Sequence, residues 1–152
     1  MYLPPESWGP FFWHTMHIAA LGYPRVPAYA HKKAAKDFFE SLKLLIPCEI
    51  CRKHYSEQLE KMPITPHLDK REDLFKWTVL LHNEVNKMLE KPIFTESQVI
   101  DYYTRLGKRG KSPVINLDDF IEVDWRARAQ GIALGVGITA AAAGIFWLMS
   151  ND

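Results

Sequence analysis

The residues best suited to chemistry in this chain are its two cysteines, which form the motif Cys48-Glu49-Ile50-Cys51. A C-x-x-C pair at a helix start can exchange disulfides, because the helix dipole and the free backbone N–H groups lower a cysteine pKa and favour the thiolate. A thioredoxin-like domain would need a βαβ context, which the sequence lacks. A zinc site would need four ligands, and only His54 offers a third. Zinc binding and two ordinary buried cysteines stay open as alternatives to a redox pair.

A second group of residues combines aromatic rings with polar side chains. A disulfide that accepts electrons must pass them on, and such residues suit a flavin ring system and its phosphates. Trp13 and His17 lie one turn apart on one predicted helix. Another predicted helix carries Trp77, His82, Asn83 and Asn86. The two faces can line one pocket, although taken singly such tryptophans are more often core residues, and such histidines more often ordinary hydrogen-bonded helix residues, than cofactor contacts.

Five amphipathic helices are expected to position these residues, because apolar side chains recur at steps of three and four. The first starts at the signal formed by Ser7 and Pro10 and ends near Gly22. The next three cover residues 28–45, 48–61 and 71–90. The fifth begins at a capping box of Thr95 and Gln98, runs to about Leu106 and stops at Gly107. No strand-rich region or internal repeat is predicted.

Residues 131–149 form an uncharged apolar run, long enough at about 1.5 Å per residue to cross a hydrocarbon core of about 30 Å. We interpret it as a transmembrane helix, with a buried core helix as the alternative. Arg126 and Arg128 precede the run and only Asp152 follows it, so the positive-inside rule places the folded domain on the cytoplasmic side. The spacing of Gly131 and Gly135 permits close packing of two such helices, but glycine is common in these segments.

Length and composition limit the remaining possibilities. A chain of 152 residues with 47% apolar and 24% charged residues suits one globular domain. Lys and Arg number 19 against 18 Asp and Glu, so the excess of positive charge that nucleic-acid binding requires is missing. Two cysteines are too few for a secreted disulfide framework. The N-terminus has neither the pattern of a signal peptide nor that of a transit peptide.

Several spaced motifs together resemble the Erv/ALR family of FAD-linked sulfhydryl oxidases, over about residues 8–103. The first helix carries Trp8-Gly9, Trp13-x-x-x-His17 and Tyr23-Pro24. The redox motif is Cys48-Glu49-Ile50-Cys51, and the FAD signature is His82-Asn83-Glu84-Val85-Asn86, which ends in Lys91-Pro92. The probability that all these motifs agree by chance is very small.

The resemblance implies a four-helix bundle with a short fifth helix, FAD in the mouth of the bundle, and a homodimer. It implies that Cys51 lies against the isoalloxazine and that Cys48 meets the incoming thiol. Tyr103 occupies a place where the family often has Trp near adenine. The implied FAD contacts are Trp8, Trp13, His17, Tyr23, Cys51, His54, Trp77, His82, Asn83, Val85, Asn86, Lys91 and Tyr103.

The implied reaction is disulfide formation in proteins: a substrate thiolate attacks Cys48, Cys51 passes electrons to FAD, and dioxygen is reduced to peroxide. The chain lacks the second cysteine pair with which cellular members shuttle electrons, so a substrate thiol or a thioredoxin-like relay protein must reach Cys48 directly. This short form is similar to the sulfhydryl oxidases of large cytoplasmic DNA viruses, for which a cytoplasm-facing anchor in a host or virion membrane is suitable.

The expected organisation is therefore an oxidase domain over residues 1–107, a linker over 108–130 and a membrane helix over 131–149. Two other functions remain open. One is a tail-anchored adaptor without flavin, in which the cysteines are incidental or hold zinc. The other is a membrane thiol-disulfide exchanger that passes electrons to another protein instead of oxygen.

Overall fold

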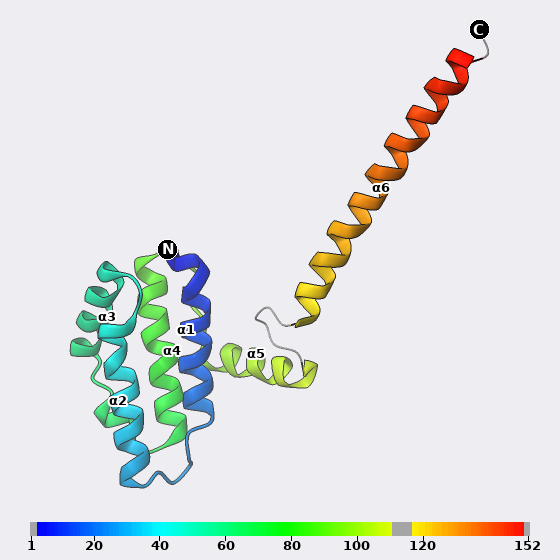
Figure 1. Ribbon diagram of the computed structural model, residues 1–152. Helices are drawn as coiled ribbons and strands as arrows, with labels where there is room; N and C mark the ends of the chain where they lie inside the picture. Colours follow the sequence, from blue (N-terminus) through cyan, green and yellow to red (C-terminus); the bar gives the residue numbers. More distant parts are fainter. Residues whose placement is uncertain (1–2, 111–116, 151–152) are drawn as a thin grey trace. The chain divides into compact units, whose positions relative to one another are not determined.

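All elements that the structure describes are helices (Figure 1). The computed structural model describes residues 3–110 and 117–150, and no strand occurs in these ranges. The α-helices are α1 (Pro5–Leu21), α2 (Tyr29–Leu45), α3 (Glu49–Lys61), α4 (Arg71–Met88), α5 (Glu96–Arg109) and α6 (Leu117–Ser150), and a short 3-10 helix, η1, spans Thr65–His67. The predicted helical class is confirmed for the described residues.

Helix α1 begins at Pro5, before the predicted start at Ser7 and Pro10. Proline suits the first helical position, because the N–H that it lacks would have no acceptor within the helix. Pro10 instead lies inside α1, where it removes one hydrogen bond to the carbonyl four residues earlier. The predicted start is therefore wrong: Pro5, and not Pro10, is the first-turn proline.

Helices α2, α3 and α4 follow the predicted ranges to within two residues at each end. Helix α4 is buried on more than one face, because both Trp77 and its neighbour Thr78 are inaccessible. The Trp77 ring packs edge-on against Phe39 of α2, whereas Thr78 faces His17 of α1. The buried positions of α4 are therefore not confined to one narrow stripe, and Leu89, just after the helix, is exposed.

Helix α5 begins as predicted and ends later than predicted. The backbone N–H of Thr95 donates to Gln98 Oε1 at 2.8 Å, and the Gln98 N–H donates to Thr95 Oγ1 at 3.3 Å, which confirms the capping box. Gly107 does not stop the helix, which continues to Arg109. Gly110 has φ +63°, a left-handed conformation that favours glycine and ends helices. The glycine that ends α5 is therefore Gly110 and not the predicted Gly107.

Helices α1 to α4 lie side by side in Figure 1, and α1 packs on α4 while α2 packs on α3. Their shared core is mainly apolar, and burial of apolar side chains contributes about 25 cal/mol per Å². The buried polar atoms have partners: Trp77 Nε1 donates to the Met62 carbonyl at 2.9 Å, and Tyr55 Oη donates to the Phe39 carbonyl at 2.9 Å. These bonds fix α3 against its two neighbours.

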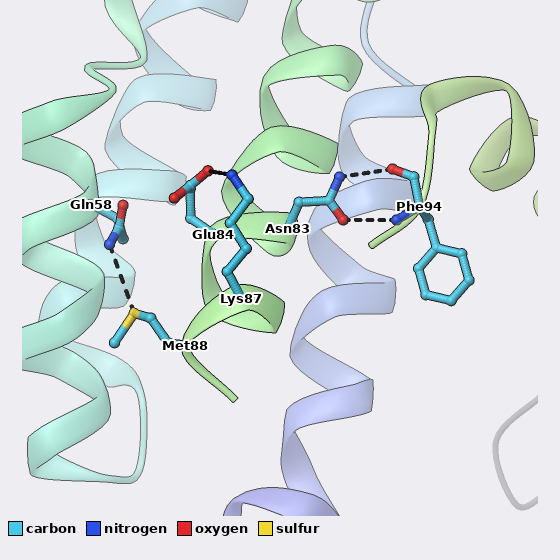
Figure 2. Close-up of polar contacts among 6 residues, drawn as sticks. All are labelled: Gln58, Asn83, Glu84, Lys87, Met88 and Phe94. Atoms are coloured by element: carbon cyan, nitrogen blue, oxygen red, sulfur yellow. Dashed lines mark hydrogen bonds and ion pairs between the residues drawn. The ribbon is translucent and has the colours of Figure 1, made fainter. Parts of the chain in front are cut away.

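Helix α3 runs antiparallel to α4. Met62, just after α3, bonds to Trp77 in the first half of α4, whereas Gln58 Nε2 lies 3.8 Å from Sδ of Met88 at the α4 end (Figure 2). The start of α3, with Cys48 before it, therefore lies toward the end of the helices where α4 finishes and α1 begins (Figure 1).

Residues 109–152 form a second compact unit, which contains α6. The segment Arg128–Trp147, of 20 residues, is long and apolar enough to cross a membrane, and none of it is buried. The linker that we predicted over residues 108–130 differs from the structure, because the helix already begins at Leu117. Residues 111–116 lie outside the described part. The helical stretch before Arg128 was missed because Gly110, Pro113 and the scattered charges favour a linker, although Leu117, Phe120 and Ile121 recur at helical spacing.

Candidate functional site

The cysteine motif forms a disulfide at the start of α3. Cys48 and Cys51 are joined, with their Cα atoms 5.1 Å apart. Cys48 is the N-cap residue, and its Sγ accepts a hydrogen bond from the Cys51 N–H at 3.3 Å. Both residues are half-buried, and Cys51 packs against the hydrophobic core. Cys48 is therefore the outer sulfur by position, and Cys51 the inner one.

Exposed apolar side chains lie near the disulfide in the sequence. Leu44, Leu45 and Ile50 are all strongly exposed, Ile50 by 63%. Arg52 Nη1 donates to the Ile46 carbonyl at 2.8 Å and so holds the turn that carries Pro47 and Cys48.

A second group of site residues lies where α1 packs on α4. The rings of Trp13 and His82 stack with centroids 3.9 Å apart and an interplanar angle of 5°. His17, one turn along from Trp13, is only 3% exposed. Its Nε2 lies 3.1 Å from His82 Nδ1, and its Nδ1 lies 2.9 Å from Thr78 Oγ1. Three of the predicted contact residues thus form one connected cluster.

Both histidines of this cluster are held in the neutral form. Burial, together with His82 and His14, lowers the pKa of His17 to about 3. Burial is also the main reason that the pKa of His82 falls to about 4, with Lys91 and His14 contributing. Near neutral pH the cluster therefore carries no charge of its own, and Lys91 is a cation within electrostatic reach of it.

Helix α5 is fastened to the same region by side chains. His14 Nδ1 lies 3.0 Å from Tyr103 Oη, and its Nε2 lies 3.4 Å from Tyr102 Oη. The Tyr103 ring is 5.9 Å from that of His17, and burial raises the pKa of its hydroxyl. Tyr103 therefore joins the Trp13–His17–His82 cluster from the α5 side.

Asn83 fixes the segment that leads into α5. Its Nδ2 donates to the Phe94 carbonyl at 2.7 Å, and its Oδ1 accepts from the Phe94 N–H at 3.1 Å (Figure 2). The Lys91 N–H donates to the Asn86 carbonyl at 2.8 Å, which turns the chain after α4. Figure 2 also shows Glu84 and Lys87, whose ion pair of 2.6 Å lies on the solvent side of α4.

Two predicted contact residues lie in the hydrophobic core. Trp77 is 1% exposed, and its indole N–H donates to the Met62 carbonyl. Tyr23 is buried, and its hydroxyl donates to the Leu68 carbonyl at 3.0 Å. Neither residue is joined to the Trp13–His17–His82 cluster by a hydrogen bond or ring contact within the described residues.

The other predicted contacts differ in their exposure. Trp8 is half-buried, packs edge-on against Phe12, and donates its Nε1 hydrogen to the Leu3 carbonyl at 3.2 Å. His54 and Val85 are half-buried, Asn86 is buried and Lys91 is exposed. Within the described part of the chain, no group of three or more His, Cys, Asp or Glu is arranged to hold a metal ion.

Sequence reasoning missed Thr78 and His14, which both contact predicted site residues. Thr78 lies one helical turn before His82, and His14 follows Trp13 directly. The one-turn spacing of Thr78 and His82 is a signal that could have identified the threonine. His14 has no comparable signal, because it acts through α5, whose placement the sequence does not give.

The side chains fit a flavin nucleotide by their chemistry. Flat, uncharged rings of Trp13, His82 and Tyr103 suit the planar ring systems of such a cofactor, and the exposed ammonium of Lys91 suits its phosphates. The disulfide at the α3 start supplies a two-electron redox couple.

Comparison with known proteins gives a consistent result. Residues 10–104 match the sequence profile described as the Erv1 / Alr family. The probable FAD-linked sulfhydryl oxidase R368 of Acanthamoeba polyphaga mimivirus is 39% identical over 100 residues, which cover 65% of this chain and 70% of that protein. The FAD-linked sulfhydryl oxidase of African swine fever virus (isolate Tick/Malawi/Lil 20-1/1983) is 36% identical over 96 residues, with 63% and 79% covered.

Solved structures agree with the sequence comparison. The crystal structure of the FAD binding domain of Erv1 from Saccharomyces cerevisiae superposes with a TM-score of 0.60 at 30% identity, covering 63% of this chain and 90% of that one. The yeast Erv1 core gives a TM-score of 0.59 at 30% identity, with 64% and 80% covered. At this identity the likeness extends beyond the general arrangement of helices.

Proposed function

The chain belongs to the Erv1 / Alr family, and on that premise we propose that it is an FAD-dependent thiol oxidase that forms disulfide bonds in substrate proteins. The observation that carries the proposal is the Cys48–Cys51 disulfide at the start of α3, in a chain whose α1–α4 contact holds a neutral aromatic cluster. The viral and yeast relatives named for FAD-linked sulfhydryl oxidation support it.

The chain's own sulfurs carry out the exchange. A substrate thiolate attacks Cys48 Sγ, the Cys48–Cys51 bond breaks, and Cys51 leaves as a thiolate in the first turn of α3, where the helix dipole stabilises it. A second substrate thiolate attacks the mixed disulfide, which releases the Cys48 thiolate and the substrate disulfide. Two electrons have then passed from substrate to protein, and the protons of the two substrate thiols have gone to solvent when the thiolates formed.

Bound FAD would supply a two-electron acceptor for these electrons, one that dioxygen can reoxidise with hydrogen peroxide as the product. We assign the face of the cofactor site to Trp13, His17, His82 and Tyr103, and its phosphate contact to Lys91. Asn83 and Asn86 shape the edge by holding Phe94 and Lys91. Tyr23 and Trp77 support the site from the core. Trp8, His54 and Val85 are peripheral contacts in this proposal.

We also propose the finer organisation that the family resemblance implies. Helices α1 to α4 act as one bundle with α5 beside it, two chains pair as a homodimer, and the partner is a thiol protein or a thioredoxin-like relay. The apolar segment Arg128–Trp147 anchors the chain in a host or virion membrane, with residues 1–107 facing the cytoplasm. The exposed apolar residues beside Cys48 suit a protein substrate.

The test uses the full chain purified in detergent. We expect a visible flavin absorption band and oxygen uptake driven by a dithiol, with peroxide as product. Cys51→Ala removes uptake and keeps the band, whereas Ser56→Ala, on the same helix outside the redox pair, keeps both. A folded but colourless protein would overturn the proposal, and reduction of the flavin without oxygen uptake would favour an exchanger.

A further inference from the structure

Thr78 lies at the contact of α1 and α4 and has no solvent exposure. Its hydroxyl donates to the Phe75 carbonyl at 2.7 Å, one turn back along α4. The same oxygen lies 2.9 Å from His17 Nδ1. A threonine hydroxyl has one proton, and here that proton is used by Phe75. Thr78 can therefore only accept from His17.

This direction determines the protons of both histidines. His17 Nδ1 must carry a hydrogen to donate to Thr78, so the Nε2 of a neutral His17 has a free lone pair. The partner of that lone pair is His82 Nδ1, 3.1 Å away, which must then carry the hydrogen of its ring. The Nε2 of His82 is consequently a hydrogen-bond acceptor.

The acceptor nitrogen of His82 is available to a ligand. It makes no hydrogen bond within the described residues, and no buried side-chain nitrogen or oxygen there lacks a partner. His82 Nε2 therefore reaches solvent, even though its ring is stacked against Trp13. The positively charged Lys91 and the nearby His14 oppose a second proton on this ring, in addition to burial.

We propose that Thr78 is a positioning residue: through His17 it sets the tautomer of His82, so that His82 Nε2 accepts a hydrogen bond from a hydroxyl or amino group of FAD. The inference rests on the proposed function for the identity of the ligand. The tautomer relay itself depends only on the contacts among Thr78, His17 and His82. Without the threonine hydroxyl, His17 can carry its hydrogen on Nε2, and His82 is then free to present a donor where an acceptor is required.

The relay can be measured without the cofactor. In the full chain labelled with ¹⁵N histidine and stripped of flavin, nitrogen chemical shifts distinguish a protonated ring nitrogen from a bare one. We expect one tautomer for His82 in the wild type, with the hydrogen on Nδ1. A hydrogen on Nε2 would overturn the proposal, whatever the behaviour of any variant.

Two substitutions then distinguish the effect of the Thr78 hydroxyl from the effect of its packing. Thr78→Val keeps the shape and removes the hydroxyl, whereas Thr78→Ser keeps the hydroxyl and loses the methyl group. We expect Thr78→Val to mix the tautomers of His17 and His82 and to weaken FAD binding about tenfold, the loss of one hydrogen bond. Thr78→Ser should keep the wild-type tautomers and FAD affinity. An unchanged nitrogen spectrum in Thr78→Val would contradict the relay.

The two proposals fail in different ways. If the wild type binds no FAD, the proposed function fails and so does the assignment of FAD as donor, whereas the nitrogen spectra still decide the tautomer. If FAD binds equally well to wild type and Thr78→Val while the tautomers differ, the oxidase proposal stands and the role of Thr78 in cofactor binding is wrong.

Discussion

The two chemically active regions of this chain are built in opposite ways. At the contact of α1 and α4, His17 is almost inaccessible and both of its ring nitrogens have partners. At the start of α3, the disulfide is half-buried and bordered by exposed Leu44, Leu45 and Ile50. The first arrangement suits a permanent ligand that needs a fixed surface, and the second suits a transient partner that must reach a sulfur atom.

The difference also explains how the two regions depend on the fold. The histidine cluster joins two helices that are far apart in sequence, so it exists only when α1 and α4 pack. The disulfide closes a ring within four residues and uses only the first turn of α3. Substitutions at the cluster should therefore change stability and cofactor binding together, whereas substitutions at the disulfide should change turnover alone.

The largest expected effect comes from Cys51→Ser. The inner sulfur can no longer leave as a thiolate, so dithiol-driven oxygen uptake should fall by at least about 100-fold, as for loss of a covalent catalyst. Flavin content, measured by absorbance of the purified full chain, should equal that of the wild type. A large loss of flavin from this variant would mean that the two regions are not independent.

Next in size is His17→Phe, which removes both hydrogen bonds of the buried ring and leaves Thr78 and His82 without this partner. Loss of partners from buried polar groups should lower the free energy of unfolding by about 2 kcal/mol. Thermal unfolding in detergent, followed by circular dichroism, measures the loss. Thr15→Val, exposed on the same helix, is the control and should stay within about 0.5 kcal/mol of the wild type.

Acid should lower the free energy of unfolding through His17 and His82. The pKa of His17 is about 3 and that of His82 about 4 in the fold, against about 6.5 in an unfolded chain. Between about pH 6.5 and pH 4 the unfolded chain binds protons that the fold does not, so the free energy of unfolding should fall as the pH falls. The melting temperature of the flavin-free chain across this range is the measurement. His82→Phe should weaken the dependence, and an unaltered slope in that variant would contradict the assignment.

The smallest effect should come from His14→Phe, which removes the hydrogen bonds of α1 with Tyr102 and Tyr103. Helix α5 is then still held by the ring contact of Tyr103 with His17 and by the bonds of Asn83 to Phe94. We expect backbone amides of α5 to exchange with deuterium about five- to tenfold faster, the loss of about one hydrogen bond, while those of α2 stay unchanged. His14→Gln, which keeps a polar side chain of similar reach, should restore part of the protection. Equal exchange in wild type and His14→Phe would mean that other contacts hold α5.

Much of the fold was accessible from the sequence because each helix has its own local signals. The capping box at Thr95, the apolar steps of α2 and the cysteines at the start of α3 lead to the observed elements. Pro10 and Gly107 misled the prediction, because proline and glycine have several permitted places in helices and tertiary packing selects among them. The start of α6 at Leu117 was not predicted, because Gly110, Pro113 and the scattered charges favour a linker there.

The sequence predicted residues of the candidate site by their type, but not which way each side chain points. Trp13, His17 and His82 were expected to share a pocket and do form one cluster. Trp77 and Tyr23 lie in the core. For Trp77 the sequence could not show this, because which face of a buried helix meets which neighbour depends on packing that single-sequence periodicity does not contain. Thr78 was missed for the same reason, since its role depends on two helices at once.

The most direct test of the account is an anaerobic titration of the purified full chain with a reduced protein dithiol, followed by the flavin absorption band. The account predicts that the band bleaches in the wild type, returns when oxygen is admitted, and does not bleach in Cys48→Ser at the same protein concentration. Bleaching that persists at the wild-type rate in Cys48→Ser would contradict the claim that the outer sulfur of the α3 disulfide receives electrons from substrate.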